Sequence, residues 1–161
     1  LTIEGTHAAG NSVGTQSVTG NLTYASGAIF EWDINANLDG DGLADGDDGT
    51  AGTSFDNVNV TGTVTASTGS IFKIVFGGGV DLADAFWSTP YVTQTWDMAA
   101  IFGASFAGSF SSIQTTADPV TQGSFTINGT SLTWTAVPEP SSALAGLLVG
   151  AGLLRRRRRN G

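Results

Sequence analysis

An acidic segment in the first third of the chain carries oxygen-bearing side chains at regular spacing. Within NLDGDGLADGDDG, residues 37–49, the candidate ligand residues are Asn37, Asp39, Asp41, Asp45 and Asp48. Counted from the first of them, they occupy positions 1, 3, 5, 9 and 12, and Gly42 stands at position 6, where the backbone must turn sharply. Loops that wrap a hard cation use oxygen ligands at such offsets. The spacing predicts a structural calcium site; the alternative is a solvated acidic loop.

This segment resembles the calcium loops of dockerin and thrombospondin type 3 repeats, with Leu43 at the position whose backbone carbonyl binds the ion. Position 12 is Asp48, whereas the helix-loop-helix version of such loops prefers Glu, and no amphipathic helices flank the segment. The resemblance therefore implies weak affinity, with Kd about 10⁻⁴ to 10⁻³ M.

Side chains that could catalyse a reaction are sparse. There is no cysteine and no G-x-S-x-G pattern, and we expect the single histidine, His7, to be an ordinary surface residue. Glu31 and Asp33 fall on one face of the predicted strand FEWDI and could act on sugars as a carboxylate pair. We favour the alternative, that they face solvent or lend oxygens to the acidic segment. A β-helix polysaccharide lyase would need a basic proton acceptor, for which Lys73 is the only candidate before the C-terminal tail. Taken with the missing motifs, this leads us to expect no enzymatic activity.

Four tryptophans, Trp32, Trp87, Trp96 and Trp134, could form a platform for stacking on carbohydrate. In β-rich domains such residues more often pack in the core, since each offers a large apolar area and a single donor. We assign them no site.

Period-two alternation of apolar and polar residues predicts strands within residues 17–24, 27–35, 54–67 and 70–76. The third segment places Phe55, Val58, Val60 and Val64 close to one face, with Gly62 at a turn or bulge.

Two further signals refine this pattern. Asn128-Gly129 lies between two alternating runs and predicts a hairpin. Short helices are expected within 81–87 and 96–106, with Asp81 and Asp97 as N-terminal caps.

The motif "apolar, Asp, small, Val, x, Val, x, Gly" over residues 17–76 resembles autotransporter-associated β-strand repeats, which stack as rungs of a parallel β-helix. We therefore predict an all-β fold with a Gly-rich, solenoid-like end, and the alternative is a β-sandwich. Twenty-three glycines and the scarcity of Glu and Lys agree with strands joined by tight turns.

The last residues differ sharply from the rest. Val137-Pro138-Glu139-Pro140 precedes an apolar run of twelve residues, 143–154, and all five arginines of the chain follow it: Arg155, Arg156, Arg157, Arg158 and Arg159. As a helix the run reaches about 18 Å, against about 30 Å of hydrocarbon, and the arginines would stop translocation on the cytoplasmic side. Without them the formal charge falls from −8 to −13, so we expect no binding to nucleic acid.

This order of motif, apolar helix and arginine cluster resembles the PEP-CTERM protein-sorting signal. The resemblance implies export, transient anchoring in the inner membrane and recognition by an exosortase, a membrane protease that acts near the Pro-Glu-Pro motif. We thus expect a β-rich domain over 1–136, the C-terminal part of a longer passenger, and a sorting tail over 137–161. The expected protein is structural or adhesive, at the cell surface or in an exopolysaccharide matrix; the alternative is a carbohydrate-binding or carbohydrate-cleaving domain.

Overall fold

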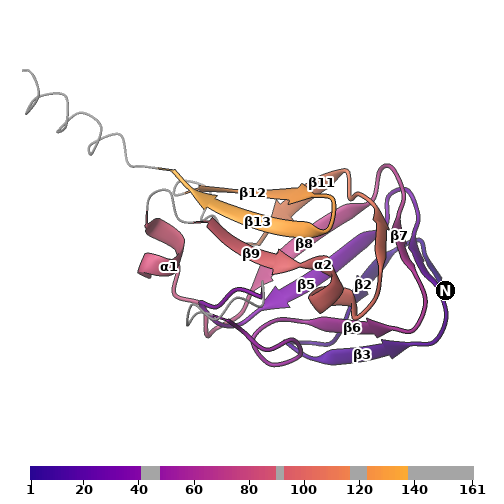
Figure 1. The fold of residues 1–161 in the computed structure, drawn as a ribbon, viewed down its shortest axis with the longest axis horizontal. Helices are drawn as coiled ribbons and strands as arrows, with labels where there is room; N and C mark the ends of the chain where they lie inside the picture. Colours follow the sequence, from indigo (N-terminus) through magenta and orange to yellow (C-terminus); the bar gives the residue numbers. More distant parts are fainter. Residues whose placement is uncertain (41–47, 90–92, 117–122, 138–161) are drawn as a thin grey trace, which may run out of the picture.

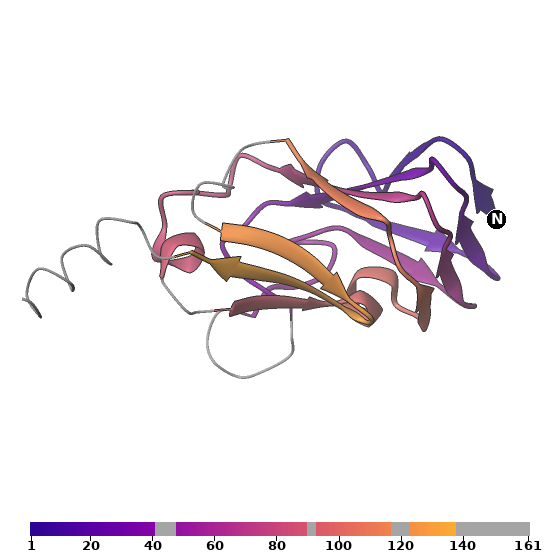
Figure 2. The ribbon, with the colours of Figure 1, turned by 90° about the horizontal axis from the view of Figure 1, so that it is seen from above.

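A computed structural model describes residues 1–40, 48–89, 93–116 and 123–137. The described part is all-β apart from two helices of one turn each, which confirms the predicted all-β character. Figure 1 shows its strands in two facing layers that are joined at one side, and Figure 2 shows the same layers from above.

Three sets of strands pair in parallel. The long sheet forms one layer and contains, in spatial order, β11 (Ser112–Thr115), β8 (Ile71–Phe76), β5 (Ile29–Ile34) and β2 (Thr6–Ala8). The short sheet closes one side and contains β1 (Thr2–Ile3), β4 (Leu22–Tyr24), β7 (Val64–Ala66) and β10 (Phe106–Gly108). The strand pair contains β3 (Thr15–Val18) and β6 (Asn57–Val60).

The chain visits these three sets in turn, so that equivalent strands stack on one another. Thr23 of β4 pairs with Thr65 of β7, and Thr65 pairs with Ala107 of β10, in steps of 42 residues. Ile29 of β5 and Ile71 of β8 keep the same step in the long sheet. Successive passes of the chain therefore place similar residues above one another.

Gly62 lies between β6 and β7 and confirms the predicted turn. A Cβ there would meet the Gly20 backbone carbonyl carbon at 2.7 Å, so only glycine fits this corner.

The layer that faces the long sheet contains the strand pair and an antiparallel sheet. This antiparallel sheet has the order β12 (Gly123–Asn128), β13 (Ser131–Ala136) and β9 (Thr93–Asp97). Asn128 pairs with Ser131, so the predicted hairpin is confirmed, with Gly129 and Thr130 as its two turn residues. Gly129 has φ +59°, a value that favours glycine at this turn.

Two short helices flank β9. Helix α1 (Ala85–Ser88) is capped by Asp84 and not, as predicted, by Asp81, because the Asp84 carboxylate accepts the hydrogen bond from Phe86 N at 2.8 Å. Helix α2 (Met98–Phe102) begins after Asp97, as predicted.

Helix α2 packs on β6, and Asn57 Nδ2 donates to the Ala100 carbonyl at 2.8 Å. Helix α2 thus occupies the position next to β6 where a third parallel strand would otherwise lie.

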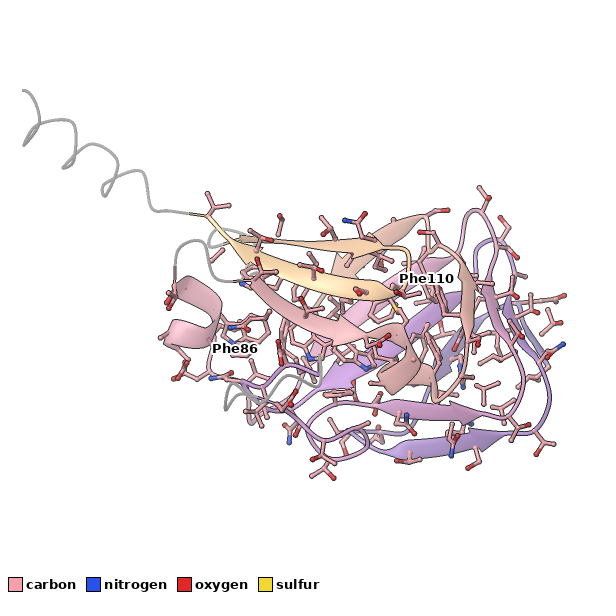
Figure 3. All side chains as sticks on the ribbon, viewed as in Figure 1. Phe86 and Phe110 are labelled. Carbon is pink, nitrogen blue, oxygen red and sulfur yellow. The ribbon has the colours of Figure 1, made fainter. Side chains whose placement is uncertain are left out.

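The core between the layers is aromatic and has two halves. The phenyl cluster lies beside the short sheet and consists of Tyr24, Phe30, Phe72, Phe102, Phe106 and Phe110. The indole cluster lies toward α1 and consists of Trp32, Trp87, Trp96, Trp134 and Phe125. Figure 3 labels Phe110 of the phenyl cluster and, beside α1, Phe86, which packs against Trp87 of the indole cluster.

The alternation of apolar and polar residues along the strands agrees with their burial. Phe55, Val58, Val60 and Val64, predicted to share a face, are all buried. The four tryptophans are completely buried too, which confirms the expectation that they pack in the core.

Candidate functional site: the acidic loop and the polar groups around it

The N-terminal end of the acidic segment is held by the indole cluster. The Asn37 side-chain oxygen accepts hydrogen bonds from Trp87 Nε1 at 2.9 Å and from Asp81 N at 3.1 Å, and its Nδ2 donates to the Asp81 carbonyl. Trp96 Nε1 donates to the Leu38 carbonyl at 3.3 Å. Asn37 therefore uses its side chain to join the segment to the residues before α1.

Asp39 and Gly40 lie against β9. Asp39 is only 2 % exposed, and its Oδ2 accepts a hydrogen bond from Thr95 N at 2.9 Å. Gly40 N donates to the Thr95 carbonyl, and Asp97 N donates to the Gly40 carbonyl. The segment thus enters the loop along the free side of β9, and this contact positions the first predicted carboxylate.

The other end of the loop returns to the same place. Gly49 N donates to the Asp39 carbonyl at 2.7 Å, and Asp48 forms a parallel bridge with Asp39. Of the five predicted calcium ligands, the structure therefore brings Asp39 and Asp48 together. Asp41 and Asp45 lie outside the described residues.

A pocket of about 270 Å³ opens beside this closure and is lined by Asp48, Thr50 and Phe55, among others. Within the described ranges, no three His, Asp or Glu side chains are grouped closely enough to hold a metal ion.

The predicted carboxylate pair on β5 is engaged with its neighbours. Lys73 of β8 lies opposite Glu31 in the parallel register, and its Nζ is 2.5 Å from Glu31 Oε1. Burial, and then the nearby Glu31 charge, raise the pKa of Asp33. Both carboxylates lie on the outer face of the long sheet, opposite the buried Trp32, as the alternation predicted.

A buried carboxylate that sequence reasoning did not single out lies nearby. Asp56 is completely buried, and its two oxygens accept hydrogen bonds from Gly14 N at 2.8 Å and Asp33 N at 2.9 Å. Burial raises its pKa to about 6, against the opposing effect of these two hydrogen bonds. Asp56 is the aspartate of the repeat-like motif that follows Phe55, so the motif was the signal that could have found it.

His7 was predicted to be a surface residue, and that prediction is wrong. Its side chain is 8 % exposed and points into the first turn of the stack, where Nδ1 is 2.7 Å from the Tyr24 hydroxyl and Nε2 is 2.5 Å from Gln16 Oε1. Because the Gln16 oxygen can only accept, Nε2 is the donor in this contact. These partners come from β3 and β4, and no short sequence motif predicts the two contacts.

The predicted sorting motif begins at Val137, which follows β13 and is exposed. Pro138, Glu139, Pro140 and the arginine cluster lie outside the described residues. In the ranges that are described, no helix is long and apolar enough to cross a membrane.

Comparison with known proteins gave no match: no family model, no curated protein and no solved structure is significantly similar to this chain.

Proposed function

We propose that the chain is an exported structural or adhesive protein of the cell surface or extracellular matrix, delivered by its C-terminal tail. The observation that carries this proposal is the order Pro138-Glu139-Pro140, apolar run 143–154 and Arg155–Arg159. Prolines on both sides of Glu139 favour an extended peptide that a protease can bind, and the arginines oppose complete translocation.

The proposed architecture of residues 1–136 is the end of a parallel β-helix closed by an antiparallel unit. The steps of 42 residues in the long and short sheets support it, because equivalent strands stack in parallel. A sandwich built from hairpins would pair consecutive strands antiparallel, and among the described strands only β9, β12 and β13 pair in this way.

Burial of the tryptophans favours the structural role over the carbohydrate-binding alternative. Sugar stacking needs aromatic faces at the surface, and none of the four indoles offers one. The carboxylates Glu31 and Asp33 are likewise a poor pair for glycosidic cleavage, since Glu31 is bound to Lys73.

The test of the tail is expression of the full chain in a Gram-negative host with and without an exosortase. We expect a smaller mature mass, and release from the inner membrane, only in the host with the protease. Replacing Pro138, Glu139 and Pro140 with alanine should leave the chain unprocessed, and Ser141→Ala, just outside the triplet, is the matched control. An identical unprocessed cytosolic product in both hosts would contradict the proposal.

For the acidic loop we propose a structural calcium ion held at the closure formed by Asp39 and Asp48, with Asp41 and Asp45 as further ligands. An ion would offset the repulsion between carboxylates, and it would not activate water. Asn37 would support the calcium site indirectly, because its side-chain oxygen already accepts two hydrogen bonds.

Calorimetry should show calcium uptake in the millimolar range. Asp41→Ala and Asp48→Ala should weaken uptake, whereas Glu4→Gln, an exposed carboxylate in the turn after β1, should not. No heat of binding at millimolar calcium would remove the metal from the proposal.

A further inference from the structure

An apolar groove runs between β11 and β12, at the seam where the antiparallel sheet meets the stacked strands. It has a volume of about 390 Å³, and Figure 1 shows the two strands next to each other on the side of the molecule away from β3. Its apolar lining consists of Phe110 and Ile113 on one side and Phe125 and Ile127 on the other. Three of these four side chains are only half-buried, and no lining residue is charged. The groove therefore leaves apolar surface partly open to water.

The C-terminal tail leaves the domain at one end of this groove. Ala136, the last residue of β13, pairs with Gly123, the first residue of β12. Val137 follows and is 56 % exposed. Residues 138–161 continue from this point, so the apolar run is attached beside the first residue of β12.

The apolar run has the length that the groove requires. The six residues of β12 span about 20 Å, and residues 143–154 span about 18 Å as a helix. The connecting residues, 137–142, can reach at most about 20 Å, whereas the path from β13 past β12 is about two strand spacings, or about 10 Å. Because the run consists only of Ala, Gly, Leu and Val, any side of it can pack on the apolar lining.

The far end of the groove offers a partner for the arginines. β12 ends beside Asp97, because Ser131, directly after the hairpin turn, pairs with Asp97. Asp97 is exposed and, with Thr130, lines a hollow of about 360 Å³. In the part of the chain that the structure describes, no basic side chain forms an ion pair with Asp97. An apolar run that follows β12 from its first residue to its last brings Arg155–Arg159 to this hollow.

We propose that the apolar run 143–154 docks in the β11–β12 groove of its own chain, with Arg155–Arg159 at Asp97, before the chain meets a membrane. Docking removes the apolar run from water and covers the half-buried side chains of the groove. It also brings five of the six cations of the chain to a domain that holds 13 of its 14 acidic residues, since only Glu139 lies in the tail.

Docking competes with insertion into a bilayer, because the same apolar residues cannot contact the groove and the hydrocarbon at once. A run of about 18 Å fills only part of a hydrocarbon layer of about 30 Å, so insertion gains less than a full span would. The groove thus holds the tail in water, and the bilayer releases it. This regulatory consequence rests on the proposed sorting function, whereas the docked contact itself does not.

Disulfide cross-linking tests the contact, since the chain has no cysteine of its own. Thr126→Cys in the groove is combined with Val149→Cys, near the middle of the apolar run. The matched control combines Val149→Cys with Ser17→Cys, an exposed position on β3. The full chain is oxidised in dilute, detergent-free buffer, and the products are separated on a non-reducing gel. We expect the intramolecular disulfide to form at least about tenfold faster from Thr126 than from Ser17.

Two substitutions, made in the Thr126–Val149 cysteine chain, weaken the contact at different points. Ile127→Asn puts an amide into the apolar lining and should slow cross-linking at least about fivefold. Asp97→Asn removes the charge but keeps a capping side chain for α2, and should slow it about two- to fivefold at low salt and less at high salt. Without the added cysteines, both substitutions should increase binding to phosphatidylcholine vesicles. Circular dichroism establishes that each variant is folded.

Equal cross-linking rates from Thr126 and Ser17 would overturn the proposal. So would a cross-linked dimer as the main product of the Thr126 chain, since the groove would then hold the tail of a second copy. The two proposals fail separately. Fast cross-linking of a chain that no exosortase processes would remove the sorting proposal alone, and processing without any excess of cross-linking would remove the docking alone.

Discussion

The two halves of the core contact the neighbouring segments through different interactions. The phenyl cluster fills space through ring contacts such as Phe30 on Phe72, with centroids 5.3 Å apart. In the indole cluster every tryptophan also donates a hydrogen bond: Trp32 to the Asp56 carbonyl, Trp87 to Asn37, Trp96 to the Leu38 carbonyl and Trp134 to the Trp87 carbonyl. Packing in this second half is therefore directional.

This difference has a consequence for the acidic loop. Two of the four indole donors, those of Trp87 and Trp96, end on Asn37 and Leu38, where the loop begins. Apolar contacts tolerate small shifts of a ring, but a buried donor must keep its acceptor. The indole half thus fixes the position of a surface loop, whereas the phenyl half mainly provides the bulk of the stacked strands.

The largest loss of stability is expected from removing a fully buried side chain of the indole cluster. Trp134→Ala removes a fully buried indole that packs on Trp87 and Phe125, and should cost about 3–5 kcal/mol of unfolding free energy in chemical denaturation. A loss below about 1 kcal/mol would show that this half of the core is loosely packed.

A pH-dependent effect is expected from Asp56, which lies under the indole cluster. Because burial raises its folded pKa from 3.8 to about 6, the protonated form is favoured in the folded state. Its contribution to stability is complete below pH 3.8 and is lost as the pH rises toward 6, a change on the order of 3 kcal/mol. Urea denaturation across this range should show the slope.

Asp56→Asn should remove most of that slope, since an amide does not titrate. Asp33→Asn, at the neighbouring half-buried carboxylate, should remove a smaller part of it. A stability that rises across this pH range in the wild type would contradict the assignment.

Two conservative substitutions compare the loss of a buried hydrogen bond with the loss of ring contacts alone. Trp87→Phe keeps an aromatic ring but removes the donor to Asn37, and should cost about 1–3 kcal/mol. Phe72→Leu, in the phenyl cluster, removes ring contacts with Phe30 and Phe110 but no hydrogen bond, and should cost a similar amount, about 1–3 kcal/mol. Hydrogen exchange of Asp39 and Gly40 should rise in the Trp87 variant and stay unchanged in the Phe72 variant; equal rises would remove the distinction between the two halves.

The smallest effect is expected outside the core. Glu31→Gln breaks the ion pair with Lys73 on the outer face of the long sheet, where both side chains are part-exposed. Its cost should be no more than about 1 kcal/mol and should shrink as salt is added. A larger cost would mean that this face is shielded from solvent, for instance by a partner.

Much of the local structure could be predicted from residue patterns. Alternation located the faces of β5, β6 and β8, and Asn128-Gly129 located the hairpin. The N-terminal cap of α1 was misplaced because Asp81 and Asp84 precede the same apolar residues, and both accept a hydrogen bond from the amide two residues ahead. Local hydrogen bonding alone therefore does not decide which of the two aspartates caps the helix.

The sequence by itself determined the all-β character, the burial of the tryptophans and the contrast between an acidic body and a basic end, since each depends on composition or on neighbours along the chain. Only the tertiary structure decided that His7 is buried against Tyr24 and Gln16, that Asp56 joins Gly14 to Asp33, and that Asp39 meets Asp48 along β9. The physical reason is that these contacts form between strands stacked in space, and the partner of a given strand depends on which passes of the chain lie next to each other.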